Sequence, residues 1–396
     1  MARITAGGSA QDGAAFVSAI LPGATIGILG GGQLGRMTAM AARSLGYRVQ
    51  VLDPDRSCPA SFVVDSCFTA AYNDVNAAAH LARGSDVVTL EIEQIAIASL
   101  EEAARYAPVR PDANVLRIVQ DRIRQKNWLQ TSGFPIGEWR PAITASELTS
   151  AVELYRRDCF IKSTSGGYDG RSQIRVKPIR ADSAEDMWKA LGSRPCVVEQ
   201  ALPLDVEISV LVARRPEGGA VVYPPALNHH ENQILDWSAI PASVSGELHK
   251  HAADLGLQIA QQLQVVGLLV IEMFVLKDGK LLVNELAPRP HNSYHASERA
   301  CVTSQFEQAV RSICDLPLGD SAVIKPAAIS NLLGDVWLGA NPPAFDRALA
   351  IPGVRLHLYE KSVPRPGRKM GHLSAIGDTV EQAVDRVIQA RNALNR

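Results

Sequence analysis

The sequence predicts an α/β fold that begins with a doubly wound parallel sheet and extends over two or three domains. The length of 396 residues is more than one hydrophobic core usually serves. Between residues 24 and 106, short apolar runs alternate with helical stretches, which is the pattern of a parallel sheet. Further along, Asp278-Gly279 joins two apolar runs and is a strong hairpin signal.

Composition and charge exclude several classes of protein. Hydrophobic residues make up 46% of the chain and charged residues 20%, which is typical of a globular protein and not of a disordered one. Lys and Arg number 40 against 41 Asp and Glu, a balance that argues against a general nucleic-acid binder. No run approaches the roughly 18 apolar residues of a membrane span. We therefore expect neither a nucleic acid nor a membrane as partner.

The cysteines and the first residues indicate where the protein resides. The six cysteines are scattered without a C-x-x-C pair, which makes both a zinc site and a disulfide framework poor interpretations. Reduced thiols in a cytoplasmic protein are expected instead. Residues 1–24 are rich in Gly, Ala and Ser and fit a secretory signal poorly, so we interpret them as a mobile extension.

The first ordered stretch is predicted to be a strand, a glycine turn and a helix. Gly30, Gly32 and Gly35 satisfy G-x-G-x-x-G, and the next strand (48–53) ends in Asp53, at about the right distance to bind a ribose. An NAD-dependent dehydrogenase is therefore an open alternative. The same turn would, however, present backbone N–H groups to any phosphate.

A further strand over residues 86–93 is predicted to end in two acids, Glu91 and Glu93. Ligands of open α/β sheets bind at the carboxyl ends of the strands. Helical patterns cover residues 75–83 and 97–106 on either side of it. A charged helical pattern over 115–132 then closes at Gly133-Phe-Pro135, which we interpret as a domain boundary.

The central part carries a glycine-rich loop and a pair of histidines. Lys162 ends a predicted strand and is followed by the loop 163–173, which contains Lys, Arg and Gly residues suited to covering phosphates. Glu207 lies on an alternating strand over 205–213. His229 and His230 are adjacent on a strand and should point to opposite faces, so they do not easily share one metal ion.

Two acids are predicted to meet at the hairpin around Asp278-Gly279. Pairing residues 267–276 with 280–287 across this turn brings Glu272 and Glu285 close together. Two carboxylates and the amide of Asn284 are oxygen ligands suited to Mg²⁺. Two surface acids beside a turn are the alternative.

The last part contains predicted strands at 324–331 and 354–359 and then a cationic Pro/Gly segment, 360–372. A solvated charged loop is the default interpretation of such a segment. Its prolines and glycines would nevertheless hold Lys361, Arg365 and Arg368 in a fixed arrangement that suits phosphate binding.

From about Thr25 onward the chain resembles the ATP-grasp superfamily, and within it the N5-carboxyaminoimidazole ribonucleotide synthetases, the ATPase subunits of phosphoribosylaminoimidazole carboxylase. The matching motifs occur in family order over almost the whole chain: 28–37 (ILGGGQLGRM), 166–173 (GGYDGRSQ), 198–200 (VEQ), 284–293 (NELAPRPHNS) and 365–372 (RPGRKMGH). The glycine motif is weak alone, whereas the last two are specific to this synthetase. Ser172, Gln233, Tyr294 and the segment 227–230 depart from the usual family pattern.

The resemblance implies a three-part fold and a reaction. The parts are a nucleotide-binding-like domain (25–122), an ATP-grasp domain with a mobile lid (123–323) and a small β-rich domain (324–396). In the implied reaction, ATP phosphorylates bicarbonate to carboxyphosphate, whose carboxyl group passes to 5-aminoimidazole ribonucleotide in purine synthesis. ATP, Mg²⁺, bicarbonate and the ribonucleotide are the expected ligands, and a cytoplasmic homodimer is the expected assembly.

The resemblance also assigns residues to roles. For ATP binding these are Arg110, Lys162, Gly167, Tyr168, Asp169, Gly170, Arg171, Ser172, Gln173, Glu199, Gln200, Ala201, Leu202, Glu207, His230, Asn284 and Glu285. For the ribonucleotide they are Gly32, Gln33, Leu34, Glu91 or Glu93, Arg289, His291, Asn292, Lys361 and Arg368. Tyr168, Asp169, Arg171, Arg289 and Lys361 are expected to act in catalysis, and Glu272 and Glu285 to hold Mg²⁺.

Three alternatives remain open. Another ATP-grasp carboxylate–amine ligase should lack the cationic segment 365–372. A dehydrogenase would leave the loop after Lys162 and the pair Glu272 and Glu285 unexplained. A catalytically dead ATP-grasp module should have lost an acid or a lysine of the centre, and none is lost.

Overall fold

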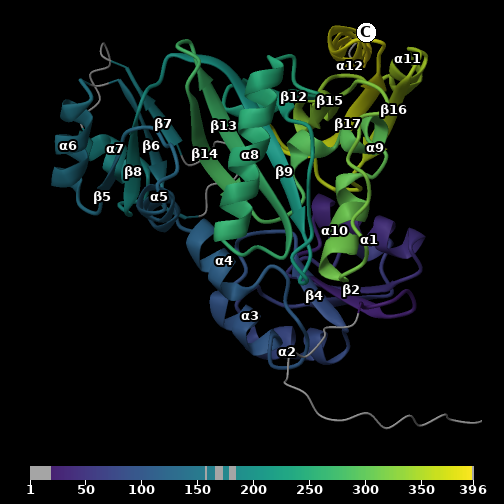
Figure 1. Ribbon diagram of the computed structural model, residues 1–396. Coiled ribbons are helices and arrows are strands. Elements are labelled where there is room, and N and C mark those ends of the chain that lie inside the picture. Colours follow the sequence, from purple (N-terminus) through teal and green to yellow (C-terminus); the bar gives the residue numbers. More distant parts are fainter. Residues whose placement is uncertain (1–18, 157, 166–172, 178–183, 395–396) are drawn as a thin grey trace, which may run out of the picture.

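The computed structural model describes residues 19–156, 158–165, 173–177 and 184–394 (Figure 1). Their strands form three sheets, one of four parallel strands, one of four antiparallel strands and one of nine strands. Most of the extension 1–24 and most of the glycine-rich loop lie outside these residues.

The N-terminal part is the parallel sheet that the sequence predicts. Its strands have the order β3-β2-β1-β4, and β1 pairs in parallel with both β2 and β4. The elements are β1 (Thr25–Leu29), α1 (Gln33–Ser44), β2 (Arg48–Asp53), η1 (Pro59–Phe62), β3 (Ser66–Thr69), α2 (Val75–Arg83), β4 (Val87–Leu90) and α3 (Ile97–Ala103). Because β1 lies between β2 and β4, the glycine turn after it faces the ends of both neighbours.

Two helices, not one, cover the stretch 115–132. They are α4 (Ala113–Val119) and α5 (Arg122–Thr131). The carboxylate of Asp121 accepts a hydrogen bond from the N–H of Arg124, 2.9 Å away, and so caps a new helix in the middle of the pattern. This break places Arg122 at the first position of α5, next to the central cavity.

A small antiparallel sheet stands at the left of Figure 1, apart from the large sheet. Its order is β5-β8-β6-β7, and α6 and α7 pack on it. The elements are β5 (Trp139–Ala142), α6 (Ala145–Leu154), β6 (Cys159–Ser163), β7 (Gln173–Val176), α7 (Ala184–Ala190) and β8 (Cys196–Gln200).

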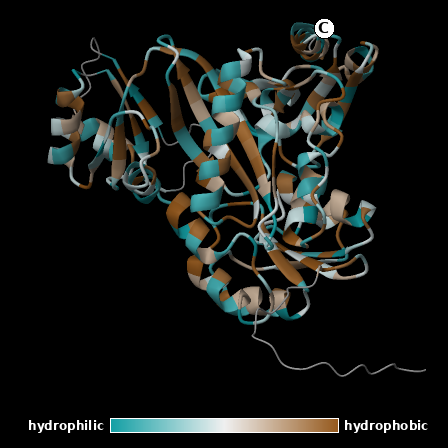
Figure 2. Ribbon diagram, in the orientation of Figure 1, coloured by the Kyte–Doolittle hydropathy of each residue, from teal (hydrophilic) through white to brown (hydrophobic). Residues whose placement is uncertain are grey.

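The large sheet runs β14-β13-β9-β11-β12-β15-β17-β16, with β10 paired to β9. Figure 2 shows brown, apolar stretches along its long strands and more teal on the helix α8 in front of them. The first six of its strands and this helix are β9 (Leu204–Arg214), β10 (Ala220–Val222), β11 (Ala226–Glu231), β12 (Ile234–Ile240), α8 (Gly246–Gln262), β13 (Gly267–Leu276) and β14 (Leu281–Ala287). Gly279 has φ +82° in the β13–β14 turn, as the hairpin signal predicts.

The C-terminal part extends this sheet and does not form one of its own. Strand β15 pairs with β12 on one side and with β17 on the other. The elements after β14 are η2 (Asn292–Tyr294), α9 (Ser297–Ala300), α10 (Gln305–Ile313), β15 (Ala327–Leu333), η3 (Gly334–Trp337), α11 (Phe345–Leu349), β16 (Val354–Leu358), β17 (Lys369–Ile376) and α12 (Val380–Ala393). The cationic segment is therefore not a loop throughout, because Lys369 to His372 belong to β17.

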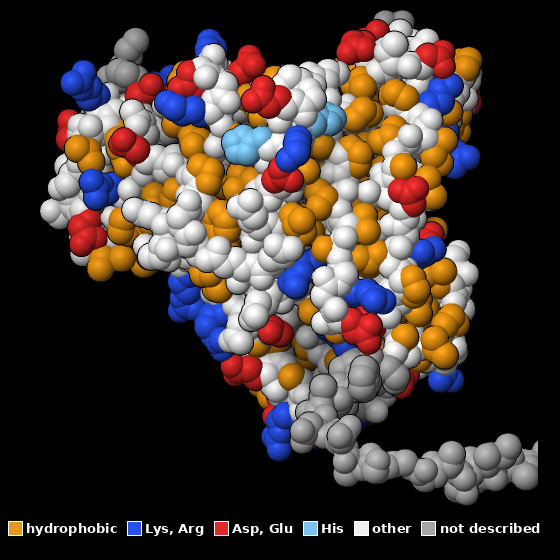
Figure 3. Space-filling view, viewed as in Figure 1, with side chains coloured by type: hydrophobic (Ala, Val, Ile, Leu, Met, Phe, Trp, Pro, Cys, Tyr) orange, Lys and Arg blue, Asp and Glu red, His pale blue; other side chains and the backbone are white. Residues whose placement is uncertain are grey.

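The surface and the cysteines agree with the composition. On the face shown in Figure 3, acidic and basic side chains are interspersed and form no stripe of one sign. All six cysteines lie in the described residues and are free thiols. In the part of the chain that the structure describes, no helix is long and apolar enough to cross a membrane.

Candidate active site

A cleft of about 400 Å³ lies between the small antiparallel sheet and the large sheet. Its walls combine apolar side chains from both sheets with a concentration of charged ones. The charged and polar side chains are Arg122, Lys126, Glu138, Lys162, Gln173, Arg175, Glu199, Gln200, Glu207, His230, Gln233, Glu272, Asn284, Glu285, Arg289, His291, Asn292 and Lys369. Many of the residues that the sequence assigns to ATP, to the ribonucleotide or to the metal are thus brought to one cavity.

Glu272 and Glu285 lie directly opposite each other on β13 and β14, beside a bulge in the ladder. Burial and then the charge of Glu285 raise the pKa of Glu272 to about 7. For Glu285 burial acts in the same direction, but the guanidinium of Arg122 outweighs it and holds the pKa well below its usual range. The two carboxylates lie close together, and the charge of Glu285 raises the pKa of Glu272. A divalent cation bound between them would stabilise both in the charged form.

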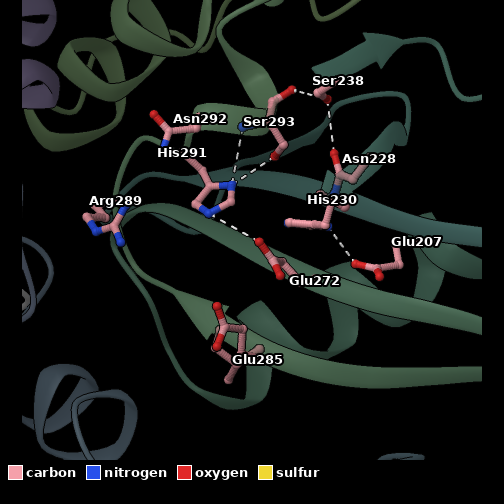
Figure 4. A network of polar contacts seen from close by, with 12 residues as sticks. Glu207, Asn228, His230, Ser238, Glu272, Glu285, Arg289, His291, Asn292 and Ser293 are labelled. Carbon is pink, nitrogen blue, oxygen red and sulfur yellow. Dashed lines mark hydrogen bonds and ion pairs between the residues drawn. The ribbon is translucent and has the colours of Figure 1, made fainter. Parts of the chain in front are cut away.

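Neighbouring side chains orient both acids. Arg122 Nη1 lies 2.8 Å from Glu285 Oε2, and His291 Nε2 lies 3.2 Å from Glu272 Oε1. Figure 4 shows the imidazole of His291 between Glu272 and Ser293, whose hydroxyl lies 2.9 Å from His291 Nδ1. Burial and the nearby charge of Arg289 lower the pKa of His291 to about 3, so its imidazole is neutral near pH 7.

Lys162 and Lys126 share one buried carboxylate. Glu199 Oε2 is 2.7 Å from Lys162 Nζ, and Glu199 Oε1 is 3.1 Å from Lys126 Nζ. Burial would raise the pKa of Glu199, but the charges of Lys126 and Lys162 outweigh it and hold the pKa well below its usual range. The arrangement keeps two ammonium groups in the cleft while one negative charge offsets them, which suits the binding of a polyphosphate.

The two adjacent histidines behave as the sequence predicts. His230 lines the cleft and its Nδ1 lies 2.8 Å from Glu207 Oε2, as Figure 4 shows. Burial opposes protonation of His230, but the hydrogen bond to Glu207 outweighs it and raises the pKa. His229 is exposed and stacks on Trp237 with ring centroids 5.2 Å apart.

The segment after β8 differs in detail from the expectation. Gln200 and Leu202 line the cleft with the apolar Phe160, Leu204 and Phe274, a setting suited to an adenine ring. The N–H of Gln200 donates to the backbone carbonyl of Glu138, and that of Ala201 donates to the backbone carbonyl of Asp158. Those two N–H groups are therefore already hydrogen-bonded within the protein and do not point to an adenine ring.

Arg110 does not reach this cleft. Its side chain is buried and its Nη1 donates to the carbonyl of Ile313, 2.5 Å away on the C-terminal side of α10. Arg110 is therefore withdrawn from the ATP-binding set. Arg122 and Lys126, which the sequence reasoning missed, line the cleft. The signal that could have found them is Asp121, whose capping role shows that a helix begins next to Arg122.

The N-terminal glycine turn is already occupied by carboxylates. Glu91 accepts hydrogen bonds from the N–H groups of Gly32 and Gly35, each 3.0 Å away. A Cβ at Gly32 would lie 2.7 Å from Glu91 Oε1, so the glycine makes room for this acid. Asp53 accepts from Gly31 N–H and from the hydroxyl of Tyr72. The donors and the acid that a dinucleotide would need are thus engaged, which argues against the dehydrogenase alternative.

A second group of polar contacts joins three parts of the chain. Glu93 Oε1 is 2.7 Å from Arg289 Nε, so Glu93 and not Glu91 pairs with this arginine. Gln33 bridges two segments, since its Nε2 donates to Asn292 and its Oε1 accepts from Lys361 Nζ. Lys361 therefore contacts the glycine turn directly through Gln33, and it does not line the cleft described above.

Arg368 does not reach the cleft. Its Nη1 donates to the carbonyl of Val363 within its own segment, and Lys369 lines the cleft instead. The reason is the strand β17, which begins at Lys369 and directs that side chain inward while Arg368 precedes it. Six further residues with predicted roles lie outside the described residues: Gly167, Tyr168, Asp169, Gly170, Arg171 and Ser172.

Three family profiles match consecutive parts of the chain. The ribonucleotide synthetase preATP-grasp domain matches residues 23–120, the ATP-grasp domain 127–306, and the phosphoribosylaminoimidazole carboxylase C-terminal domain 327–386. The matches come in the same order as the three parts that the resemblance implies.

Known proteins are similar over nearly the whole chain. The N5-carboxyaminoimidazole ribonucleotide synthase of Bacillus subtilis is 39% identical over 369 residues, which cover 93% of this chain and 95% of the relative. The synthase of Brucella melitensis is 38% identical over 91% of this chain and 98% of its own length. A solved structure of the Aspergillus clavatus synthase in complex with ADP and 5-aminoimidazole ribonucleotide has a TM-score of 0.86 at 32% identity, covering 94% of this chain and 99% of that one.

Proposed function

The chain belongs to the N5-carboxyaminoimidazole ribonucleotide synthase family of ATP-grasp ligases, and from this premise we propose how its residues perform the reaction. The enzyme carboxylates 5-aminoimidazole ribonucleotide in an ATP-dependent reaction of purine synthesis. The reaction forms a carbon–nitrogen bond and yields N5-carboxyaminoimidazole ribonucleotide, ADP and phosphate.

ATP lies with its adenine between the small sheet and the large sheet. The apolar side chains of Phe160, Leu204 and Phe274 flank the ring, and Glu207 with His230 lies where ribose hydroxyls would follow. Lys162, Lys126 and Arg122 then meet the phosphates, where charge-assisted hydrogen bonds are the strong ones. The residues of the loop 167–172 complete this cover in our proposal.

Glu272 and Glu285 fit Mg²⁺. They are opposed in register, they line the cleft, and the charge of one raises the pKa of the other. Asn284 adds an amide oxygen beside them. When bound, the ion would neutralise phosphate charge and align the terminal phosphoryl group.

The ribonucleotide binds where the N-terminal and C-terminal parts meet the motif around Arg289. Lys361, Gln33 and Asn292 already form a connected set of donors and acceptors there. Arg289 is held by Glu93, so its guanidinium is fixed in direction before substrate binds. We propose that this group of side chains contacts the phosphate and the ribose of the ribonucleotide. Gly32, Leu34 and Glu91 belong to the same binding site in our proposal.

The chemistry requires two transfers in one closed space. A bicarbonate oxygen attacks the γ-phosphorus, the bond to the β–γ bridging oxygen breaks, and ADP leaves with its electron pair. The exocyclic amine then attacks the carbonyl carbon of carboxyphosphate, and phosphate departs and takes the proton of the amine. Arg122, Lys162 and Arg289 contribute positive charge where negative charge develops. In our proposal Tyr168, Asp169 and Arg171 lie beside the bicarbonate, and His291 lies beside Glu272.

Several further assignments are proposals that rest on the same family membership. We propose a homodimer in the cytoplasm, and the domain division 25–122, 123–323 and 324–396. Light scattering of the purified chain measures the first of these directly, with twice the 42.6 kDa of one chain expected.

The observation that carries the assignment is the single cleft in which the pair Glu272 and Glu285 meets Arg122, Lys126 and Lys162. The test is ADP formation with bicarbonate, measured with and without 5-aminoimidazole ribonucleotide. We expect ADP formation to rise strongly when the ribonucleotide is added and to need bicarbonate for product. ADP release that responds to neither compound would contradict the assignment.

A further inference from the structure

We propose that Glu298, His357 and His372 form a binding site for a divalent transition-metal ion, separate from the catalytic cleft. Together they offer a carboxylate oxygen and two imidazole nitrogens, and these three atoms lie within 4.8 Å of one another. Across the residues that the structure describes, no other three His, Cys, Asp or Glu side chains come as close together. None of the three lines the cleft.

The two histidines are held in place by the sheet. His357 on β16 and His372 on β17 are directly paired in register, and their rings stack with centroids 5.0 Å apart and planes 14° apart. His372 is 1% exposed, and its Nδ1 lies 2.8 Å from the hydroxyl of Tyr359. A ligating histidine commonly uses its second nitrogen in such a contact, which fixes the ring and leaves Nε2 for the metal.

Glu298 supplies the adjustable ligand. It lies on α9, which packs against β17, and its side chain is 35% exposed. Its Oε2 is 4.0 Å from His357 Nδ1. With metal–ligand bonds of about 2.0–2.1 Å in a tetrahedral site, ligand atoms lie about 3.3 Å apart. The distance of 4.0 Å between Glu298 Oε2 and His357 Nδ1 is longer than this, so the partly exposed Glu298 side chain would move toward the histidines when the ion binds.

The donor set selects the class of ion. Two imidazoles and one carboxylate suit Zn²⁺ or Co²⁺, whereas Mg²⁺ prefers oxygen ligands alone. Three protein ligands would leave at least one position for water. The charges of Arg299 and Arg355 act on Glu298 and oppose a bound cation, so we expect weaker binding than at a closed four-ligand site.

A bound ion would connect two segments that serve the catalytic cleft. Helix α9 begins five residues after Asn292, and β16 and β17 flank the segment that carries Lys361. Holding α9 to the β16–β17 pair would therefore stabilise the fold around these substrate-side residues. This effect is structural and needs no change in the chemistry of the cleft.

The test uses the full chain saturated with MgADP, so that the catalytic carboxylates are engaged. Zn²⁺ is titrated against a chromophoric zinc indicator, and Co²⁺ is followed by its visible absorption. We expect one ion per chain, a rise in the thermal midpoint, and at least about a tenfold loss of affinity in both Glu298→Gln and His357→Asn. His372 is left unchanged because it is buried and its loss could impair folding.

Two matched variants separate this site from other zinc ligands. His251 is exposed on α8, and Cys58 has its Sγ 3.9 Å from that of Cys67. His251→Asn and Cys58→Ser should retain full Zn²⁺ affinity and the Co²⁺ spectrum. Equal Zn²⁺ affinity in the wild type and in both Glu298→Gln and His357→Asn would overturn the proposal, as would loss of binding only in Cys58→Ser.

Discussion

Replacing Arg122 with Ala tests the phosphate side of the cleft most sharply, because the sequence pointed to a different arginine. Arg122 is 24% exposed in its side chain and lies 2.8 Å from Glu285, at the start of α5. A hydrogen bond to a charged group is worth about 1.5–3 kcal/mol. Because this side chain is partly solvated, the lower part of that range applies, and each 1.36 kcal/mol is tenfold in rate. We expect kcat/KM for ATP to fall by roughly 10- to 30-fold.

The assay is steady-state ADP release at saturating bicarbonate and 5-aminoimidazole ribonucleotide, with ATP varied. Arg124 is exposed on the same helix, so Arg124→Ala is the matched control and should leave kcat/KM for ATP unchanged. Arg110→Gln, checked for folding by circular dichroism, should lower stability without affecting kcat/KM for ATP, because Arg110 contacts the carbonyl of Ile313 and not the cleft. A normal kcat/KM for ATP in Arg122→Ala, together with a lowered kcat/KM for ATP in Arg110→Gln, would refute the proposal that Arg122 and not Arg110 contacts the phosphates.

Four further outcomes follow from the same site. Glu285→Gln should nearly abolish ATP turnover in a protein that circular dichroism shows to be folded, because the charge of Glu285 is needed for Mg²⁺; turnover like that of the wild type would exclude it as a ligand. The pKa of Glu272 is raised to about 7, so its carboxylate is protonated below that pH; the apparent affinity for Mg²⁺ should rise from pH 6 to pH 8, and a flat profile would contradict this. Glu199→Gln leaves two buried ammonium groups unpaired, which should cost about 3–5 kcal/mol and lower the thermal midpoint by about 4–6 °C; saturating MgADP should restore part of the loss in calorimetry, and an equal loss with and without nucleotide would argue against phosphate binding there. Lys361→Ala should raise the KM for the ribonucleotide and not that for ATP, since Lys361 contacts Gln33 at the glycine turn; a change in the KM for ATP alone would place it elsewhere.

Features that depend on local pattern were predictable from the sequence. The hairpin turn at Asp278-Gly279 sets the register of β13 and β14 as far as Met273 opposite Val283, which brings Glu272 close to Asn284 and Glu285. The bulge between Glu272 and Met273 then shifts the pairing, so that Glu272 lies directly opposite Glu285. The opposite orientations of His229 and His230 follow from the alternation of side chains along a strand. The parallel N-terminal sheet follows from the alternation of strands and helices.

Features that depend on tertiary packing were not predictable in the same way. Arg110 and Arg122 are both arginines near a domain boundary, and only the fold shows that Arg110 turns toward α10. Arg368 and Lys369 are neighbours in a cationic segment, and the start of β17 between them decides which one faces the cleft. The glycine motif reads like a dinucleotide site, because nothing in its spacing reveals that Glu91, 56 residues beyond Gly35, takes its N–H groups.

The path of a bicarbonate oxygen tests the central claim most directly. Bicarbonate labelled with ¹⁸O is supplied with ATP and 5-aminoimidazole ribonucleotide, and the released phosphate is analysed by ³¹P NMR or mass spectrometry. If bicarbonate attacks the γ-phosphorus and the amine then displaces phosphate, one labelled oxygen appears in each phosphate formed with product. Phosphate that carries no label, with its new oxygen taken from water, would contradict the account.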